Sequence, residues 1–242
     1  MSKGRGHRAE GTVPLNRALS KLGVLSRTQA TEAVLAGRVR VDGRIVRTPT
    51  AAVVPEKAHI ALDGRPARKA RWRTILFHKP KGVVTTRTDP EGRRTIYDVL
   101  GEAGAGLIAV GRLDLATSGL LLLTTDTQLA DWLTDPANEV PRLYVVTVRG
   151  RVSAGAIQDL PGTITIRKAS ERETHLLVEL REGRNRQVRR MFDDIGHEVT
   201  SLARVRFGGL ELGSLVPGAH REILHREMSK AFPRAPLREV NL

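Results

Sequence analysis

An aspartate in a glycine-bounded loop has the setting best suited to chemistry in this 242-residue chain. Asp114 lies within the segment 111–123, GRLDLATSGLLLL, between two short apolar stretches. Such a loop presents a carboxylate at the rim of a sheet, where binding and catalytic groups often lie. Loop aspartates also form turns and helix caps, so the spacing alone leaves a catalytic role and a structural role open.

Two other side chains could act with this carboxylate. Tyr144 lies in the alternating segment 142–148, on the same face of a predicted strand as two valines. Its ring could therefore stack on a ligand or pack in the core. Arg189 lies in a run of cations on a predicted helix over 186–195. It could pair with a carboxylate, bind phosphate or remain solvated.

The composition narrows the class of protein. There are 40 Lys and Arg against 26 Asp and Glu, a net charge of +14, and no cysteine. The lack of cysteine excludes a disulfide framework, a thiolate nucleophile and Cys-ligated metal centres, and the histidines show no metal-ligand spacing. No apolar run approaches the ~20 residues of a membrane span, and the first residues lack the apolar core of a secretory signal. We therefore expect a cytoplasmic protein with a polyanionic partner, most commonly nucleic acid.

The positive charge is concentrated in the first third of the chain. Residues 1–74 carry a net +11, whereas residues 75–242 carry +3. This asymmetry indicates a basic binding module joined to a nearly balanced domain.

The basic module has clear structural signals. Three leucines at helical spacing predict a helix that ends at Gly23, and Ser26 with Gln29 resembles a capping box that opens a second helix. Alternation on either side of Asp42-Gly43 predicts a hairpin over 38–46. Arginines on these elements form a basic surface that could follow phosphates: Arg27, Arg38, Arg40 and Arg44.

The rest of the chain has many short strands and few helices in no regular alternation, which favours an α+β domain with a mixed, mainly antiparallel sheet. Predicted strands include 75–77, 83–86, 107–110, 120–123, 142–148, 164–166, 176–180, 199–202 and 205–207, and Asp126 is predicted to cap a helix. The expected organisation is a basic flexible tail (1–12), a small RNA-binding domain (13–62), a linker (63–73), a larger domain (74–230) and a loose tail (231–242).

Four motifs in this order resemble the pseudouridine synthases, specifically the RsuA/RluB-type enzymes of ribosomal RNA. Segment 111–123 is similar to the family's catalytic motif, and 78–82, HKPKG, to its strand-end Lys-Pro-x-Gly. Segment 142–144, RLY, resembles its basic-x-Tyr strand, and 182–192, EGRNRQVRRMF, its C-terminal signature. The N-terminal helices and hairpin resemble the S4-like RNA-binding domain that many members carry.

The resemblance implies an RNA isomerase, which detaches uracil from its ribose, rotates it and rejoins it through carbon 5. Nothing is oxidised and no group is added, so no cofactor and no metal are expected. By resemblance Asp114 is the catalytic carboxylate. Attack on the ribose, attack on the base and removal of a sugar proton all remain open. Each needs an ionised carboxylate, which a nearby cation favours, and the resemblance assigns that cation to Arg189.

The same motifs supply the remaining site residues. Tyr144 would be the third catalytic residue, stacking on a base that has left the RNA stack. Val188 would form an apolar wall of the pocket, and Arg112 would either bind phosphate or support the loop. The predicted RNA-binding residues of this domain are Lys79, Arg184, Arg186 and Arg190.

We expect a monomer that acts on ribosomal RNA or on a ribosomal assembly intermediate. The turn 89–93 and the segment 184–186 are closer to members that modify large-subunit (23S) RNA. A small-subunit (16S) target is one alternative. A non-catalytic RNA-binding or assembly factor is another, although the three predicted catalytic residues are all present. Hydrolysis by paired carboxylates is disfavoured, because no second acid shares the Asp114 motif.

Overall fold

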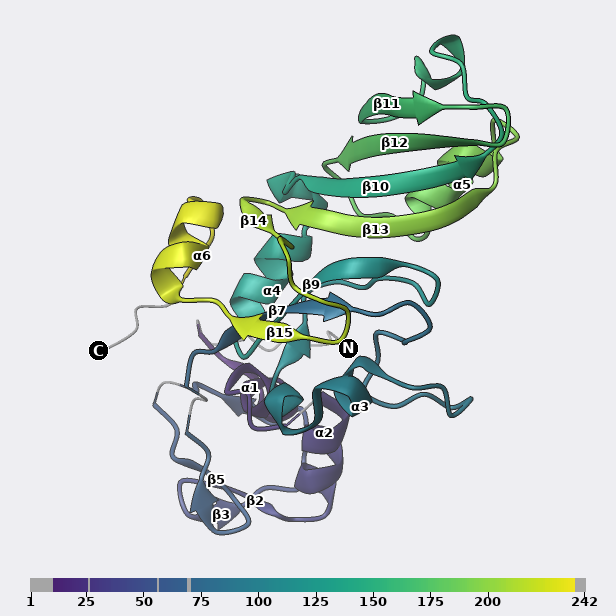
Figure 1. Ribbon diagram of the computed structural model, residues 1–242. Coiled ribbons are helices and arrows are strands. Elements are labelled where there is room, and N and C mark those ends of the chain that lie inside the picture. Colours follow the sequence, from purple (N-terminus) through teal and green to yellow (C-terminus); the bar gives the residue numbers. More distant parts are fainter. Residues whose placement is uncertain (1–10, 26, 56, 69–70, 238–242) are drawn as a thin grey trace, which may run out of the picture. The chain divides into compact units, whose positions relative to one another are not determined.

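The chain folds as two units, Met1–Arg71 and Trp72–Leu242. The computed structural model describes residues 11–25, 27–55, 57–68 and 71–237 (Figure 1). The predicted tail up to residue 10 and the predicted helix cap Ser26 lie outside the described residues.

The N-terminal unit has two short helices, a two-stranded sheet of β1 and β4, and a four-stranded sheet of order β3-β2-β5-β6. Its elements are β1 (Val13–Pro14), α1 (Leu15–Lys21), α2 (Arg27–Leu35), β2 (Val39–Val41), β3 (Arg44–Ile45), β4 (Ala52–Val53), β5 (Ile60–Leu62) and β6 (Arg65–Pro66). Leu15, Leu19 and Val34 are fully buried in the core between them. The predicted hairpin is confirmed: β2 pairs with β3, and Asp42 and Gly43 have φ values of 49° and 80°. Two positive φ values are what a two-residue turn of this hand requires.

The prediction of a linker over 63–73 is wrong for its first residues, which belong to the folded N-terminal unit. Asp63 and Gly64 have φ values of 52° and 76° and form a second hairpin, in which β6 pairs with β5. Ala67 then packs against the core of the same unit. The physical reason is the same Asp-Gly turn that formed the first hairpin.

The second unit is built on a nine-stranded sheet of order β11-β12-β10-β13-β9-β7-β15, with β14 paired to β13 and β8 to β9. Its strands are β7 (Thr74–Lys79), β8 (Ile108–Ala109), β9 (Ser118–Thr124), β10 (Arg142–Arg149), β11 (Thr163–Ala169), β12 (Glu173–Leu180), β13 (Val199–Phe207), β14 (Leu210–Glu211) and β15 (His220–Glu222). All pairs are antiparallel except β9 with β13. The predicted α+β class with a mixed, mainly antiparallel sheet is confirmed.

Helices cover both halves of this sheet. They are α3 (Ile96–Leu100), α4 (Thr127–Thr134), α5 (Gln187–Asp193) and α6 (His225–Ala231), with 3-10 helices at Gly101–Gly104, Pro136–Asn138 and Gly155–Ile157. The Asp126 carboxylate accepts hydrogen bonds from the first turn of α4, as predicted. Phe192 of α5 packs on Val146 and Val178 in one half. Among the described residues, no helix has both the length and the apolar character to cross a membrane.

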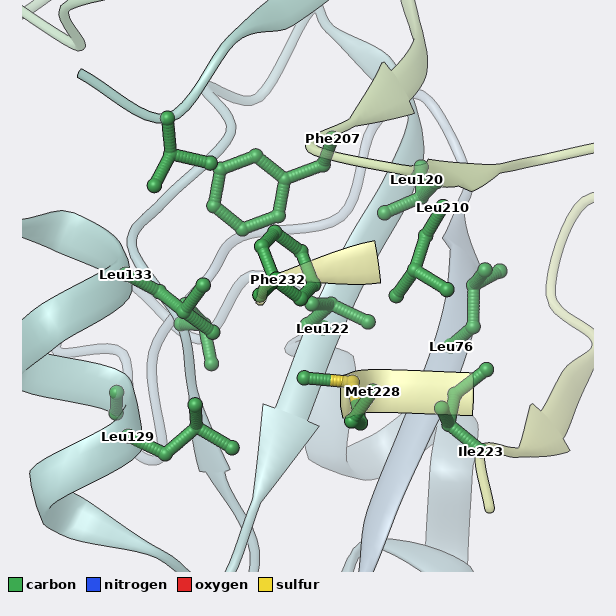
Figure 2. Packing of buried hydrophobic residues seen from close by; sticks show 13 residues of the cluster. Leu76, Leu120, Leu122, Leu129, Leu133, Phe207, Leu210, Ile223, Met228 and Phe232 are labelled. Carbon is green, nitrogen blue, oxygen red and sulfur yellow. The ribbon is translucent and has the colours of Figure 1, made fainter. Parts of the chain in front are cut away.

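The predicted loose tail over 231–242 is wrong as far as residue 237. Phe232 is 3% exposed and packs edge-on against Phe207, with ring centroids 5.7 Å apart (Figure 2). Gly208 makes room for it, since an added Cβ there would lie 2.0 Å from the Phe232 ring. Ala235 and Leu237 pack against the same core, because an aromatic anchor holds the chain there. Residues 238–242 lie outside the described residues.

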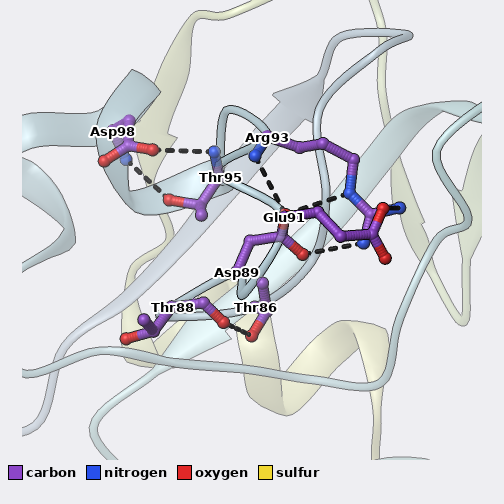
Figure 3. Close-up of polar contacts among 7 residues, drawn as sticks. All are labelled: Thr86, Thr88, Asp89, Glu91, Arg93, Thr95 and Asp98. Carbon is purple, nitrogen blue, oxygen red and sulfur yellow. Dashed lines mark hydrogen bonds and ion pairs between the residues drawn. The ribbon is translucent and has the colours of Figure 1, made fainter.

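Two strand predictions also differ from the structure. Residues 199–207 form one strand instead of two. Residues 83–86 form no strand: Val84 makes a single bridge to Thr95, and the chain turns outward. The turn is closed by Asp89, whose carboxylate accepts three hydrogen bonds from Arg93, and by the Thr95–Asp98 capping box of α3 (Figure 3). Side-chain bonds therefore replace the strand ladder here.

The two halves of the sheet meet where β9 runs parallel to β13, with Gly119 opposite Arg204. Gly119 has a φ of +108°, and an added Cβ would lie 2.2 Å from the Arg204 carbonyl oxygen. Only glycine allows this backbone approach.

We expect Gly119→Ala to lower the free energy of unfolding by about 3 kcal/mol, from backbone strain plus overpacking. Gly106→Ala is the matched control, because Gly106 also has a positive φ of +70° but no atom within 4 Å of the added Cβ. It should cost about 1 kcal/mol. Urea unfolding measures both, and equal losses would show that the β9–β13 contact tolerates a side chain.

Candidate active site

The loop that carries Asp114 joins β8 to β9 and is braced by its neighbours. The Thr117 amide donates to the Asp114 carbonyl at 3.1 Å, which closes a turn. The Thr85 hydroxyl donates to the Leu113 carbonyl at 2.8 Å, and the Gly82 amide to the Leu115 carbonyl at 2.8 Å. The segment that leaves β7 thus holds this loop in place from outside.

The structure brings Arg189 of α5 to this loop. Its Nε lies 3.4 Å from Asp114 Oδ2. Its other nitrogens donate to the carbonyls of Val199, at 2.9 Å, and Ala116, at 3.2 Å. The two charged side chains are 10% and 20% exposed, so their attraction is only partly screened by water. The other carboxylate oxygen, Asp114 Oδ1, is buried without a hydrogen-bond donor among the described residues.

A second cation, Lys79, is buried beside the same loop. Its ammonium group donates to the carbonyls of Thr117, at 2.8 Å, and Pro80, at 3.0 Å. Burial lowers the pKa of Lys79 to about 8, against an opposing effect of the Asp114 charge. The prediction that Lys79 binds RNA is wrong, because its side chain is fully buried and cannot reach a phosphate.

A cavity of about 450 Å³ opens beside Asp114 and Arg112. Tyr144 and Val188 form part of its wall, and Arg184 and Arg186 lie at its edge. Tyr144 also packs against the core of its half of the sheet, so the same side chain contacts the core and lines the cavity. Arg190 is exposed on α5 and does not line the cavity.

Sequence reasoning missed two buried arginines next to Tyr144. Arg204 lies opposite Tyr144 in the β10–β13 pair, and its Nε donates to the Leu120 carbonyl at 2.8 Å. Arg142 donates to three backbone carbonyls. Both guanidinium groups lie over the Phe207 ring, 5.0 Å and 5.2 Å from its centroid. The signal was present for Arg204, which lies inside the strand 199–207, where a charged side chain needs buried acceptors, whereas Arg142 is the first residue of β10.

Glu182 is a second carboxylate in the cavity wall, outside the Asp114 motif. It forms an ion pair with Arg184 and accepts a hydrogen bond from the Gln187 side chain. Its charge is therefore balanced locally. Within the described residues, no three His, Cys, Asp or Glu side chains gather as metal ligands do.

Lys79 makes the stability of this unit depend on pH. Its pKa is about 8 in the folded protein, against about 10.4 in an unfolded chain. Between these values the unfolded chain binds more protons, so the free energy of unfolding rises with pH, by up to about 3 kcal/mol.

We expect Lys79→Met to lack this rise. Urea unfolding gives the free energy of unfolding of wild type and variant between about pH 7.5 and about pH 10. The difference between the two proteins isolates the contribution of Lys79, because the titrations of all other groups cancel. Lys81→Met, which removes an exposed lysine, should follow the wild type. Parallel stability curves for wild type and Lys79→Met would contradict the assignment.

Comparison with known proteins agrees with this architecture. The RNA pseudouridylate synthase family model matches residues 73–194, and the S4 domain model matches residues 13–55. A solved structure described as a pseudouridylate synthase has a TM-score of 0.61 and 27% identity, and covers 90% of this chain and 99% of its own.

Two curated relatives extend over most of the chain. An uncharacterized RNA pseudouridine synthase of Aquifex aeolicus (strain VF5) is 34% identical over 94% of this chain and 97% of its own. Ribosomal large subunit pseudouridine synthase B of Escherichia coli (strain K12) is 39% identical over 84% of this chain and 76% of its own. With the fold, the carboxylate-lined cavity and these relatives in agreement, the chain belongs to the RNA pseudouridylate synthase family and carries an S4 domain ahead of the synthase domain.

Proposed function

We propose that this synthase modifies a uridine of large-subunit ribosomal RNA, with Asp114 as its catalytic carboxylate. The observation that carries the proposal is the Asp114–Arg189 pair at the cavity, at 3.4 Å. The similarity to large-subunit synthase B, at 39% identity, supports this RNA over a small-subunit target. The substrate would be the RNA or an assembly intermediate, which the protein would meet in the cytoplasm as a monomer.

The cavity suits a single nucleotide that has left its stack. Tyr144 offers an aromatic face and Val188 an apolar wall, so the base exchanges stacking in RNA for stacking in the protein. Arg189 places a positive charge beside the carboxylate on which each mechanism of this family depends. The glycosidic bond from N1 to the sugar breaks, the base rotates and carbon 5 takes its place. The proton lost from carbon 5 balances the one gained at N1.

The rival functions have weaker support in the geometry. Hydrolysis by two carboxylates would need a second free acid, but Glu182 is held by Arg184 and Gln187. Burying the Asp114 Oδ1 atom without a hydrogen-bond donor lowers the stability of the folded protein, and a non-catalytic binding factor gives no reason for this cost. Such groups are rare in folded proteins, and a substrate that supplies a donor would account for this one.

We expect Asp114→Asn to reduce turnover by roughly 10³-fold or more, because the amide has no negative charge to act on the nucleotide. Tritium release from RNA labelled at carbon 5 of uridine measures this. RNA affinity should stay near that of the wild type, since phosphate contacts supply most of it.

Asp131→Asn is the control for this experiment, because it removes an exposed carboxylate of α4 away from the cavity. It should release tritium at the wild-type rate. Turnover of the Asp114→Asn protein near the wild-type rate would contradict the assignment of Asp114 as the catalytic carboxylate.

We further propose that exposed arginines of the N-terminal unit bind phosphates. Arg27 and Arg44 are exposed, and Arg40 donates to the Gly43 carbonyl at 2.9 Å, which leaves its charge without an acidic partner among the described residues. Arg38 differs, since it forms a two-bond ion pair with Asp63.

Replacing Arg27, Arg40 and Arg44 by Gln should weaken RNA binding and flatten the plot of log affinity against log salt by about 0.7–0.9 for each phosphate that the variant no longer neutralises. Turnover at saturating enzyme should persist, because the Asp114 cavity lies in the other unit. Arg38→Gln, which removes a charge already balanced by Asp63, should change the slope less. An unchanged slope in the triple variant would show that this surface does not bind RNA.

A further inference from the structure

One residue of the cavity wall has a strained backbone. Arg186 has φ 50° and ψ 31°, in the left-handed region that favours glycine. Among the described residues, the other non-glycine positions with positive φ are Asp42, Asp63 and Glu139. Two of these are aspartates in hairpin turns, a residue type that tolerates the conformation. Arg186 instead lines the cavity, and such strain persists only where surrounding structure holds it.

The surrounding structure is a ring of hydrogen bonds and one ion pair, which we call the 182–187 clamp, formed by Glu182, Arg184 and Gln187. The Glu182 carboxylate forms an ion pair with Arg184, with Nε 2.9 Å from Oε2, and accepts a hydrogen bond from Gln187 Nε2. Gln187 Oε1 accepts a hydrogen bond from the backbone N–H of Arg184, and the backbone N–H of Gln187 donates to the Arg184 carbonyl, both at 3.2 Å. Gln187 is 8% exposed. The clamp therefore fixes the chain on both sides of Arg186.

The clamp also separates three arginines that look alike in the sequence. Arg184 forms an ion pair with Glu182, and Arg190 lies outside the cavity wall. Arg186 is exposed at the cavity, and the structure gives it no acidic partner within the described residues. Arg112, also exposed at the cavity, has no acidic partner within the described residues either, so an incoming anion would meet the charges of Arg186 and Arg112.

The anion at that position would be a phosphate of the substrate itself. A base that rotates about its backbone into a cavity leaves its two flanking phosphates at the mouth. Arginine binds phosphate through paired, charge-assisted hydrogen bonds, and a fixed backbone reduces the entropy lost on binding.

We propose that Arg186, held in its strained conformation by the 182–187 clamp, binds a phosphate next to the flipped uridine. The inference rests on the proposed function, since it takes the Asp114 cavity as the place where the uridine enters. Arg186 then acts as a positioning residue, which holds the backbone while the base is inside.

The test measures binding of a ribosomal RNA stem–loop that contains the target uridine, over a range of salt. Arg186→Asn removes the charge but tolerates the left-handed backbone. It should weaken binding about tenfold, flatten the salt slope by about 0.7–0.9, and leave the melting temperature unchanged or higher. Arg186→Lys should keep most of the slope. Arg172→Asn, at an exposed arginine outside the cavity, is the matched control.

A second arm locates the phosphate. An uncharged methylphosphonate at a phosphate flanking the uridine should weaken binding to the wild type but not further weaken binding to Arg186→Asn. Likewise Glu182→Gln, which opens the clamp, should add little to the loss in Arg186→Asn. Additive losses in either pair would overturn the proposal, as would an Arg186→Asn protein that binds like Arg172→Asn.

These outcomes are separate from the proposed function. If the wild type releases no tritium from uridine in ribosomal RNA, the proposed function fails whatever Arg186 does. If tritium is released but the Arg186 variants bind normally, only the phosphate assignment fails.

Discussion

The parallel contact of β9 with β13 across Gly119 is the constraint on which the catalytic unit depends. β9 follows the Asp114 loop directly, whereas β13 follows α5, which carries Arg189. The close approach at Gly119 therefore joins the two halves of the sheet and sets a carboxylate from one half against a guanidinium from the other. A side chain at this position would separate the halves and the ion pair together.

Once the halves are joined, buried cations gather around the cavity. Lys79 donates to two backbone carbonyls and Arg204 Nε to one, and Arg189 uses two carbonyls besides Asp114. Carbonyl dipoles solvate these charges without cancelling them. The cavity thereby keeps a positive surrounding, which favours a polyanionic substrate. Its stability cost is the desolvation of the cations, which is visible in the low pKa of Lys79.

Local sequence predicted elements whose signals are local. The Asp42-Gly43 hairpin, the Asp126 cap and the alternating strand around Tyr144 all form as expected, because turn chemistry, capping and alternation act over a few residues. The errors occur where distant contacts prevail. Residues 83–86 look like a strand but brace the Asp114 loop instead, and Phe232, in an apparent tail, is drawn into a core that forms around Phe207.

The sequence by itself determined the fold class, the basic N-terminal unit and the family motifs with Asp114, Tyr144 and Arg189, because composition, periodicity and motif order are properties of the chain. Only the tertiary structure decided which cations are available to contact a phosphate of the substrate. Lys79 is buried, Arg184 is held by Glu182, and Arg186 is exposed at the cavity with no acidic partner among the described residues. These residues look equivalent along the chain, since a charge's role depends on its burial and its partners, and long-range packing creates both.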